Sequence, residues 1–204
     1  SSKSDAHRLL IAAALADHPT KILLEGWNND IEATKNCLEA LGCKITRNGN
    51  GMEVTPLWAA ETKDIVLDCG ESGSTLRFLL PVVAALGKQA IVEGQGRLPE
   101  RPIGILLEEL RRHGCVVKED SLPLEMSGGM SGGVFTLPGN VSSQFITGLL
   151  FALPLLEEDS QIRLTTIMES RGYVDMTLET LKMFGIIIDE QECGFFIKGG
   201  QIYR

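Results

Sequence analysis

The sequence repeats one order of segments three times, and this repetition limits the possible folds more than any single motif does. Apolar stretches at residues 7–16, 76–86 and 145–156 are each followed by a short strand-like stretch and then by an amphipathic stretch. Each amphipathic stretch ends at a glycine, and a pair of strand-like stretches follows it. The three glycines, Gly42, Gly114 and Gly185, are 72 (114 − 42) and 71 (185 − 114) residues apart. Self-similarity at a nearly fixed spacing indicates that one supersecondary unit is used repeatedly.

The hydrophobic pattern separates two kinds of helix. The apolar stretches have no polar face beyond their first turn, which is typical of helices buried inside a domain. The stretches 30–41, 102–113 and 174–184 carry charge on one side and Leu, Ile or Met on the other, so we expect them on the outside. Short strands rich in β-branched residues are predicted at 21–26, 51–55, 90–93, 116–118, 122–126, 161–165, 186–189 and 195–198.

Together these elements predict a single α/β domain over residues 1–204. Its three helix–strand–helix–strand–strand units are expected at about 1–58, 68–130 and 135–204. We expect the buried helices to pack side by side in parallel, with small sheets around them. A chain of 204 residues with 44% hydrophobic residues is large enough to bury such a core.

Serines recur at the starts of the apolar helices. Aligning the three copies puts Ser4, Ser74 and Ser143 at the helix heads, 70 (74 − 4) and 69 (143 − 74) residues apart. Serine is a good N-cap, so capping alone is one interpretation of all three. The other follows from parallel packing, which would bring three helix N-termini to one end of the domain. Free N–H groups and dipoles at that end attract phosphates or carboxylates.

The charge balance excludes one class of partner and leaves another open. The formal net charge of −8 and the lack of a basic stripe argue against nucleic acid. Local cations still allow a small anionic ligand. Lys3 and Arg8 flank the first helix head, Arg77 follows the second, and Arg97 and Arg101 bracket the turn before residue 102. Solvated surface charge is the alternative for each of them taken singly.

The sequence predicts neither a membrane span nor a secretory signal. No apolar run approaches the roughly 20 residues that cross a bilayer, and no signal peptide is recognisable, so we expect no membrane partner and a cytoplasmic location.

The histidines and cysteines do not form recognisable sites. The histidines, His7, His18 and His113, are too scattered to predict a metal site or a Ser/His/Asp group. The cysteines form no Cys-x-x-Cys pair, and we interpret them as small core residues in a reducing compartment. They are Cys37, Cys43, Cys69, Cys115 and Cys193.

Five motifs occur in the order and spacing of a known family. They are SKSDAHR (2–8), GESGSTLR (70–77), RLPERPIG (97–104), SSQF (142–145) and SRGYVDMT (170–177). Together they resemble the N-terminal half of the 5-enolpyruvylshikimate-3-phosphate synthases, over the whole chain. The resemblance implies the enolpyruvyl transferase fold, an inside-out α/β barrel-like domain. It also implies transfer of an enolpyruvyl group from phosphoenolpyruvate to the 5-hydroxyl of shikimate 3-phosphate in aromatic amino acid biosynthesis, with no cofactor.

The resemblance also assigns residues to the two substrates. Lys3 is implied to contact phosphoenolpyruvate and to lie between the substrates, which makes it the catalytic candidate of this chain. Phosphoenolpyruvate, with which the inhibitor glyphosate competes, would be bound by Lys3, Gly73 and Arg101. Shikimate 3-phosphate would be bound by Lys3, Ser4, Arg8, Ser142, Ser143, Gln144, Ser170 and Tyr173.

The residue types fit these roles. Ser4 and Arg8 share one helix face because they are four residues apart. Arg101 offers a guanidinium fork that makes paired bonds to an anion, and Gly73 lets the backbone approach a ligand closely. Arg101-Pro102 also fits a helix start with proline at the first helical position, which is the structural alternative.

Two departures from the family pattern affect these expectations. Glu71 stands where many relatives have Asn, so a carboxylate lies near the phosphoenolpyruvate residues; it could pair with an arginine, restrain the loop or face solvent. The family enzyme is also about twice as long, and the residues that transfer protons belong to its other lobe. We therefore expect an excised N-terminal lobe that is a monomer and binds shikimate 3-phosphate without turnover. Its expected natural partner is the C-terminal lobe.

Three alternatives to this function follow from the sequence. The related transferase that acts on UDP-N-acetylglucosamine shares the fold, but the Ser4/Arg8 pair, the 142–144 triplet and Tyr173 argue against it. A stand-alone, non-catalytic anion-binding module would use the same repeat. Nucleotide binding is suggested by the glycines at 94 and 96 and at 128–133, yet neither stretch has a full dinucleotide or phosphate-loop fingerprint.

Overall fold

The computed structural model describes residues 2–204 and shows an α/β domain. Within these residues none of the helices is long and apolar enough to cross a membrane. Short 3-10 helices form at η1 (Leu57–Ala59), η2 (Leu98–Glu100) and η3 (Leu153–Leu155). The α-helices are α1 (Lys3–Leu15), α2 (Asn29–Ala40), α3 (Gly73–Leu86), α4 (Gly104–Arg112), α5 (Ser143–Ala152) and α6 (Arg171–Met183).

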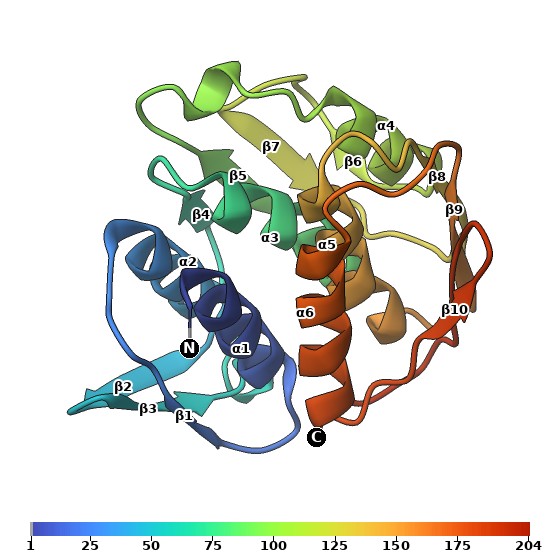
Figure 1. Ribbon diagram of the computed structural model, residues 1–204. Helices are drawn as coiled ribbons and strands as arrows, with labels where there is room; N and C mark the ends of the chain where they lie inside the picture. The colour runs from blue at the N-terminus through green and yellow to red at the C-terminus, as the bar shows by residue number, and fades with distance from the viewer. Residues whose placement is uncertain (1) are drawn as a thin grey trace.

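Three small sheets surround the helices (Figure 1). The first is antiparallel, with the order β1-β3-β2, and the other two are mixed, with the orders β4-β5-β7-β6 and β10-β11-β9-β8. Only the pairs β4/β5 and β8/β9 run parallel within the described chain. The strands are β1 (Thr20–Leu23), β2 (Lys44–Asn48), β3 (Gly51–Thr55), β4 (Ile65–Asp68), β5 (Ala90–Glu93), β6 (Val116–Val117), β7 (Leu124–Ser127), β8 (Gly133–Leu137), β9 (Ser160–Leu164), β10 (Asp189–Gln191) and β11 (Gly194–Ile197).

The amphipathic helices end in the same way in all three units. Gly42, Gly114 and Gly185 follow α2, α4 and α6 with φ of +113°, +106° and +77°. The amide of the next residue donates to a carbonyl five residues earlier, as in Cys43 N to Leu38 O at 3.0 Å, and the same bond forms at residues 115 and 186. Only glycine adopts this left-handed conformation cheaply, so the predicted stop glycines are confirmed.

The helix heads differ from the prediction by one or two residues. The N-caps of α1, α3 and α5 are Ser2, Ser72 and Ser142, each 70 residues after the one before, and each side chain accepts from a first-turn amide. The predicted heads Ser4, Ser74 and Ser143 instead lie inside the first turn. The prediction was wrong about the cap because each motif carries two or more small hydroxyl residues, and sequence alone does not choose between them.

Proline positions explain two further corrections. Helix α5 ends at Ala152 rather than at residue 156, because Pro154 has no amide to donate and the chain continues as the 3-10 helix η3. Pro102 is not the first residue of a helix, since α4 begins only at Gly104. The Arg101-Pro102 pair therefore lies in the link between η2 and α4.

Three strands were not predicted, and several others are shifted by a few residues. Strand β2 exposes four of its five residues, so it lacks the apolar alternation that marks a strand. Strand β8 begins at the end of the glycine-rich stretch, which hides it, and β4 is a short parallel strand before α3. Strands β4 and β8 precede α3 and α5 as additional strands of the second and third units.

Helices α1, α3 and α5 form the buried centre, as their apolar sequences predict. Helix α1 packs between α2 and α6, α3 packs on α5, and α4 lies outside against β6 and β8 (Figure 1). The approach of α3 to α5 depends on Gly148, where a Cβ would collide with the carbonyl of Arg77 and press on the ring of Pro81. Gly148 therefore leaves room for the ring of Pro81 where α3 and α5 meet.

The cysteines are all free, as expected from their spacing. Four of them are buried, and Cys43 and Cys115 follow stop glycines in equivalent positions. Burial raises the pKa of the Cys43 thiol to about 12, so this group stays protonated at neutral pH. Cys193 is exposed in the turn between β10 and β11, so its interpretation as a core residue was wrong.

Candidate anion-binding site at the helix N-termini

A hollow of about 470 Å³ opens where the N-terminal ends of α1, α3, α5 and α6 meet. We call this the N-terminal pole. It carries four cationic side chains and five serines, and no carboxylate is among the residues that line it. Its lining residues are Lys3, Ser4, Arg8, Ser74, Arg77, Phe78, Arg101, Val141, Ser142, Ser143, Gln144, Ser170 and Tyr173.

The helix ends themselves supply donors at this pole. The serine caps bind the amides of Asp5, Thr75 and Gln144. The amides of Ser74 and Ser143, which precede the capped ones, have no protein partner within residues 2–204. Unpaired amides and converging helix dipoles favour negative charge, so the pole is a candidate binding site for an oxyanion.

Helix α1 contributes two cations that differ in their freedom. Lys3 is half-exposed and forms an ion pair with Asp30, in the first turn of α2. Arg8 is only 2% exposed. Its Nη1 donates to the Ser4 carbonyl at 2.9 Å and its Nη2 to the Tyr173 carbonyl at 3.0 Å. Its Nε donates to Thr177 Oγ1 at 2.8 Å. Arg8 therefore joins α1 to α6 as well as lining the hollow.

Helices α3 and α5 are joined across the hollow by Gln144. Its Oε1 accepts from Arg77 Nη1 at 2.9 Å, and its Nε2 donates to Ser74 Oγ at 2.9 Å. Arg77 Nη2 also donates to the Pro102 carbonyl at 3.1 Å, and the guanidinium lies over the ring of Phe145, 5.4 Å from its centroid. Arg77 thus holds the head of α5 and the link before α4 in place.

Arg101 is the least constrained cation of the pole. It is exposed, and its side chain makes no hydrogen bond or ion pair to residues 2–204. Its Nη1 lies against Gly73, where an added Cβ would come within 2.5 Å of it. A guanidinium that is close to the α3 head and free of protein partners is available for an anionic ligand.

Burial alters the titration of the basic residues at this pole. Burial lowers the pKa of Arg8 to about 10, and burial with the nearby charge of Arg101 lowers the pKa of Arg77. Both remain cationic at neutral pH. His7, beneath the hollow, has its pKa lowered to about 4 by burial and by the charge of Lys3, so it is neutral there.

Ser170, at the head of α6, has an unusual backbone. Its φ of +54° and ψ of +40° are left-handed, and its side chain caps nothing. Non-glycine residues adopt this conformation at a cost, and such positions cluster at functional sites. The conformation turns the chain into α6 beside Tyr173, whose side chain is about half exposed at the hollow.

The structure brings together nearly all of the residues that the sequence motifs suggested. Nine of the ten predicted residues line the hollow, and the tenth, Gly73, lies against Arg101. Arg97 is separate, since it is exposed and paired with Glu100. The motif argument did not assign Phe78 and Val141 to the site, because apolar residues next to a helix head give no sequence signal of ligand binding.

Glu71 makes no ion pair or hydrogen bond within the described chain. Its exposed carboxylate lies over Gly96, which has φ of +59°, and a Cβ at that glycine would overlap it. The proposed pairing with an arginine is therefore absent from residues 2–204. Glu71 packs on the turn after β5 and is not among the residues that line the hollow.

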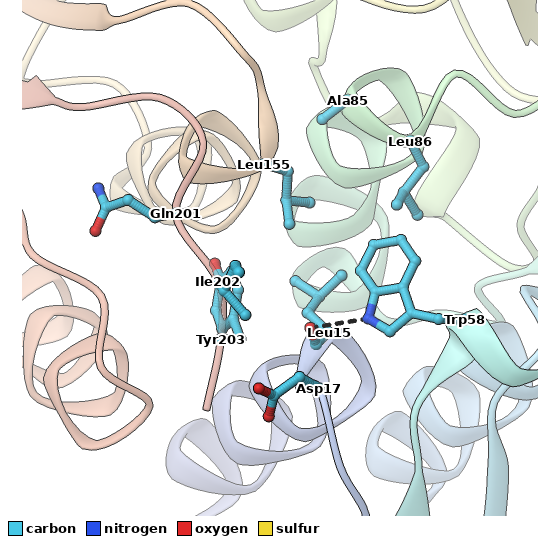
Figure 2. Close-up of a pocket in the computed structure, with 9 residues that line it drawn as sticks. All are labelled: Leu15, Asp17, Trp58, Ala85, Leu86, Leu155, Gln201, Ile202 and Tyr203. Atoms are coloured by element: carbon cyan, nitrogen blue, oxygen red, sulfur yellow. Dashed lines mark hydrogen bonds between the residues drawn. The ribbon is translucent and has the colours of Figure 1, made fainter.

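A second hollow, of about 330 Å³, lies at the opposite ends of the same helices (Figure 2). We call this the C-terminal pole. Leu15, Leu86 and Leu155 come from the C-terminal ends of α1 and α3 and from η3 after α5. Trp58 Nε1 donates to the carbonyls of Leu15 at 3.2 Å and Ala16 at 3.1 Å. The N-ends of the three buried helices line one hollow and their C-ends line the other, so the helices run parallel.

The comparisons with family profiles and with curated proteins agree on one family. The family profile described as EPSP synthase (3-phosphoshikimate 1-carboxyvinyltransferase) matches residues 1–204. Proteins named 3-phosphoshikimate 1-carboxyvinyltransferase from Clostridium kluyveri and Clostridium beijerinckii are 41% and 42% identical to the chain. Each alignment covers 100% of this chain but only 48% and 49% of the relative. The chain thus spans about half the length of the curated relatives it matches.

Solved structures share the fold. A structure of EPSP synthase from Acinetobacter baumannii superposes with a TM-score of 0.84 at 22% identity. The superposition covers 99% of this chain and 46% of that one. At this identity the likeness establishes the arrangement of helices and sheets.

Proposed function

Because the chain belongs to the EPSP synthase family, we propose that it is the lobe of a 3-phosphoshikimate 1-carboxyvinyltransferase that binds shikimate 3-phosphate. Such an enzyme transfers the enolpyruvyl group of phosphoenolpyruvate to the 5-hydroxyl of shikimate 3-phosphate and releases phosphate. One observation carries the proposal. The N-terminal pole surrounds converging helix N-termini with four cations and five serines, and no carboxylate lies among its lining residues.

Shikimate 3-phosphate is assigned to the α1, α5 and α6 side of the pole. Ser142 and Ser143 take the 3-phosphate, because their hydroxyls and the unpaired amide of Ser143 are neutral donors beside the α5 dipole. The shikimate ring is surrounded by Ser4, Arg8, Gln144, Ser170 and Tyr173. The bonds of Gln144 to Arg77 and Ser74 support this assignment, since they fix the amide before the ligand arrives.

Phosphoenolpyruvate is assigned to the α1 and α3 side. Arg101 binds one of its anionic groups with a guanidinium that has no other partner in residues 2–204. Gly73 leaves room for that group next to the α3 backbone. Lys3 lies between the two substrates, where its ammonium offsets the repulsion between their anionic groups. Its ion pair with Asp30 keeps the ammonium at the mouth of the hollow.

The lobe is proposed to bind without catalysing turnover. Proton transfer to and from the enolpyruvyl carbon needs a general acid and base within hydrogen-bond reach. The lining residues include no carboxylate, and the neutral imidazole of His7 is buried below the hollow. The second lobe of the full-length relatives would supply these groups and close over the pole.

An NMR titration of the chain with shikimate 3-phosphate tests the assignment. Amide shifts are expected near Ser4, Ser143 and Tyr173, with weaker shifts for shikimate, which lacks the phosphate. UDP-N-acetylglucosamine serves as the control acceptor and is expected to cause none. Shifts scattered over the sheets, or a preference for the nucleotide sugar, would refute the assignment. Steady phosphate release from both substrates by this chain alone would refute the absence of turnover.

Inhibition by glyphosate tests the phosphoenolpyruvate side in an enzyme that contains this lobe. With Gly73 retained, we expect glyphosate to compete with phosphoenolpyruvate. A Gly73→Ala change places a methyl group 2.5 Å from Arg101 Nη1 and so displaces the guanidinium. The inhibition constant is expected to rise at least about tenfold, as for the loss of one charged hydrogen bond. Unchanged inhibition would argue against Gly73 as part of this site.

A further inference from the structure

We propose that two buried threonine hydroxyls, Thr75 and Thr177, act as separate positioning residues for the two halves of the N-terminal pole. Thr75 would position the phosphoenolpyruvate side and Thr177 the shikimate 3-phosphate side. The naming of the two halves rests on the function proposed above. The physical division into two networks does not, because it follows from hydrogen bonds beneath the hollow.

Both networks consist of hydroxyls that are completely removed from solvent. Thr34, Thr75, Thr147 and Thr177 each have 0% of their surface exposed. A buried hydroxyl is unfavourable unless it is hydrogen-bonded. A helical threonine usually meets this need by bonding to the carbonyl four residues earlier. Here the threonines also bond to one another between helices, which ties the helix heads together.

Thr75 is the centre of the first network. Its Oγ1 lies 2.7 Å from Thr34 Oγ1 on α2, 2.8 Å from Ser72 Oγ at the cap of α3, and 3.3 Å from the carbonyl of Asp30. Thr34 in turn lies 2.7 Å from His7 Nδ1 on α1. The network therefore connects α1, α2 and α3 within the first two turns of each helix.

The first network reaches two groups assigned to phosphoenolpyruvate. Asp30, whose carbonyl Thr75 contacts, holds Lys3 by its carboxylate. Ser72, whose hydroxyl Thr75 contacts, immediately precedes Gly73. The relative positions of Lys3 and Gly73 thus depend on one hydroxyl that touches neither.

Thr177 is the centre of the second network. Its Oγ1 accepts from Arg8 Nε at 2.8 Å, lies 2.8 Å from Thr147 Oγ1 on α5, and donates to the Tyr173 carbonyl at 3.2 Å. Arg8 and Tyr173 both line the hollow, and Thr147 lies one turn below Ser143 in α5. This network connects α1, α5 and α6 on the side assigned to shikimate 3-phosphate.

Each central hydroxyl is saturated by its partners. A hydroxyl has one proton to donate and two lone pairs that accept. Thr177 donates to Tyr173 and accepts from Arg8 and Thr147, and Thr75 likewise has three partners. Valine has the same shape without the hydroxyl, so a Thr→Val change removes all three bonds while it keeps the packing. The two variants are matched, because each central residue is fully buried and has three polar partners.

The first arm of the test needs no ligand. Backbone amide spectra of Thr75→Val and Thr177→Val are compared with the wild-type chain. Thr75→Val is expected to shift amides around Lys3, Asp30 and Gly73, and Thr177→Val those around Ser143 and Tyr173. Shifts that spread equally over both halves in each variant would overturn the division. This arm stays decisive even if the wild-type chain binds neither substrate, which would be a failure of the proposed function alone.

The second arm measures affinity. Thr177→Val is expected to weaken shikimate 3-phosphate binding about tenfold, because Arg8 Nε loses its acceptor, and Thr75→Val is expected to change it less than about twofold. With shikimate 3-phosphate saturating, phosphoenolpyruvate binding should respond in the opposite order. Equal losses for both ligands in both variants would indicate general loosening of the core and would overturn the proposal.

A milder pair of variants covers the case in which the central ones do not fold. Thr34→Val and Thr147→Val each remove the outer hydroxyl and leave the central hydroxyl with its other two partners. The same crossed pattern is expected at about threefold rather than tenfold. Loss of the crossed pattern in this folded pair would count against the proposal as strongly as in the first.

Discussion

The two poles of the domain are opposite ends of the same three helices, and they differ in whether the free backbone groups of the helix ends have protein partners. At the C-terminal pole the protein satisfies exposed carbonyls with its own donors. Trp58 Nε1 donates to the carbonyl of Leu15 at the end of α1 (Figure 2). The buried Tyr203 hydroxyl donates to the Phe151 carbonyl of α5. At the N-terminal pole the first-turn amides of Ser74 and Ser143 are left without protein partners and are surrounded by cations.

This difference explains why the N-terminal pole, and not the C-terminal pole, is the candidate ligand site. Helix dipoles give both ends a partial charge, positive at one and negative at the other. A donor supplied by the chain closes an end, whereas unpaired amides with nearby arginines leave it open to an anion. Four variants and one control test this contrast. Arg8→Met at the N-terminal pole should alter binding and stability together, whereas the two variants at the C-terminal pole should alter stability alone.

The largest effect is expected for Arg8→Met. The substitution keeps the unbranched aliphatic part of the side chain but removes the guanidinium with its three hydrogen bonds, and it leaves the carbonyls of Ser4 and Tyr173 without their donor. The free energy of unfolding should fall by about 4 kcal/mol, and shikimate 3-phosphate binding should be lost. Urea unfolding and the NMR titration measure the two effects.

Arg171→Met is the control for Arg8→Met. Arg171 is an exposed arginine of α6 with ion pairs to Asp175 and Glu190. Exposed pairs contribute little, so the loss should stay below about 1 kcal/mol. Similar losses for the two arginines would contradict the importance given to Arg8.

The second effect is a loss of stability in acid caused by His7. As the pH falls below about 6.5, the unfolded chain protonates this histidine, while the folded chain resists until about pH 4 because the ring is buried. The folded state is therefore penalised progressively between pH 6.5 and pH 4, by up to about 3 kcal/mol. Unfolding experiments on the wild type and His7→Asn at several pH values measure it. The two curves should converge toward acid, and parallel curves would show that His7 is not the cause.

Tyr203→Phe should have a smaller effect, confined to stability. The change leaves the Phe151 carbonyl without its hydrogen bond, at a cost of about 1.5 kcal/mol at neutral pH. Burial raises the pKa of Tyr203, so the wild type should lose stability as the pH rises above 10, and the variant should lack this component. Shikimate 3-phosphate binding should be unchanged. Weakened binding would mean that the two poles are coupled.

Trp58→Phe should have the smallest effect. The indole is about half exposed, and its Nε1 shares its proton between two carbonyls at the end of α1. Those carbonyls can bind water after the change, so the expected loss is about 0.5 kcal/mol. Thermal unfolding measures it, with ligand titration as the control. A loss as large as that of Tyr203→Phe would show that the indole bond matters more than its exposure indicates.

The parts of the fold that were predictable are those encoded in local runs of residues. Stop glycines at 42, 114 and 185 mark helix ends because only glycine enters the left-handed conformation freely. Long apolar runs identify the buried helices. Strand β2 was missed because four of its five residues are exposed, so it lacks the apolar alternation that marks a strand.

The candidate site was predictable as a set of residues but not as a geometry. Family motifs indicated Lys3, Arg8 and Arg101, yet nothing in their sequence distinguishes their environments. In the structure Arg8 is buried and hydrogen-bonded to α6, whereas Lys3 is paired with Asp30. Arg101 has no hydrogen-bond or ion-pair partner for its side chain in residues 2–204. Those differences depend on which groups from other helices lie within hydrogen-bond distance.

The sequence by itself determined the order of the motifs, the stop glycines after α2, α4 and α6, and the family, because each of these depends on residues that are close together or on motifs in register. Only the tertiary structure decided that the helix heads share one hollow and that threonines join in pairs beneath it. Thr34 and Thr75 are 41 residues apart, and Arg8 and Thr177 are 169 apart. Contacts over such separations arise from packing of whole helices, and local side-chain patterns carry no record of which distant hydroxyl a helix will meet.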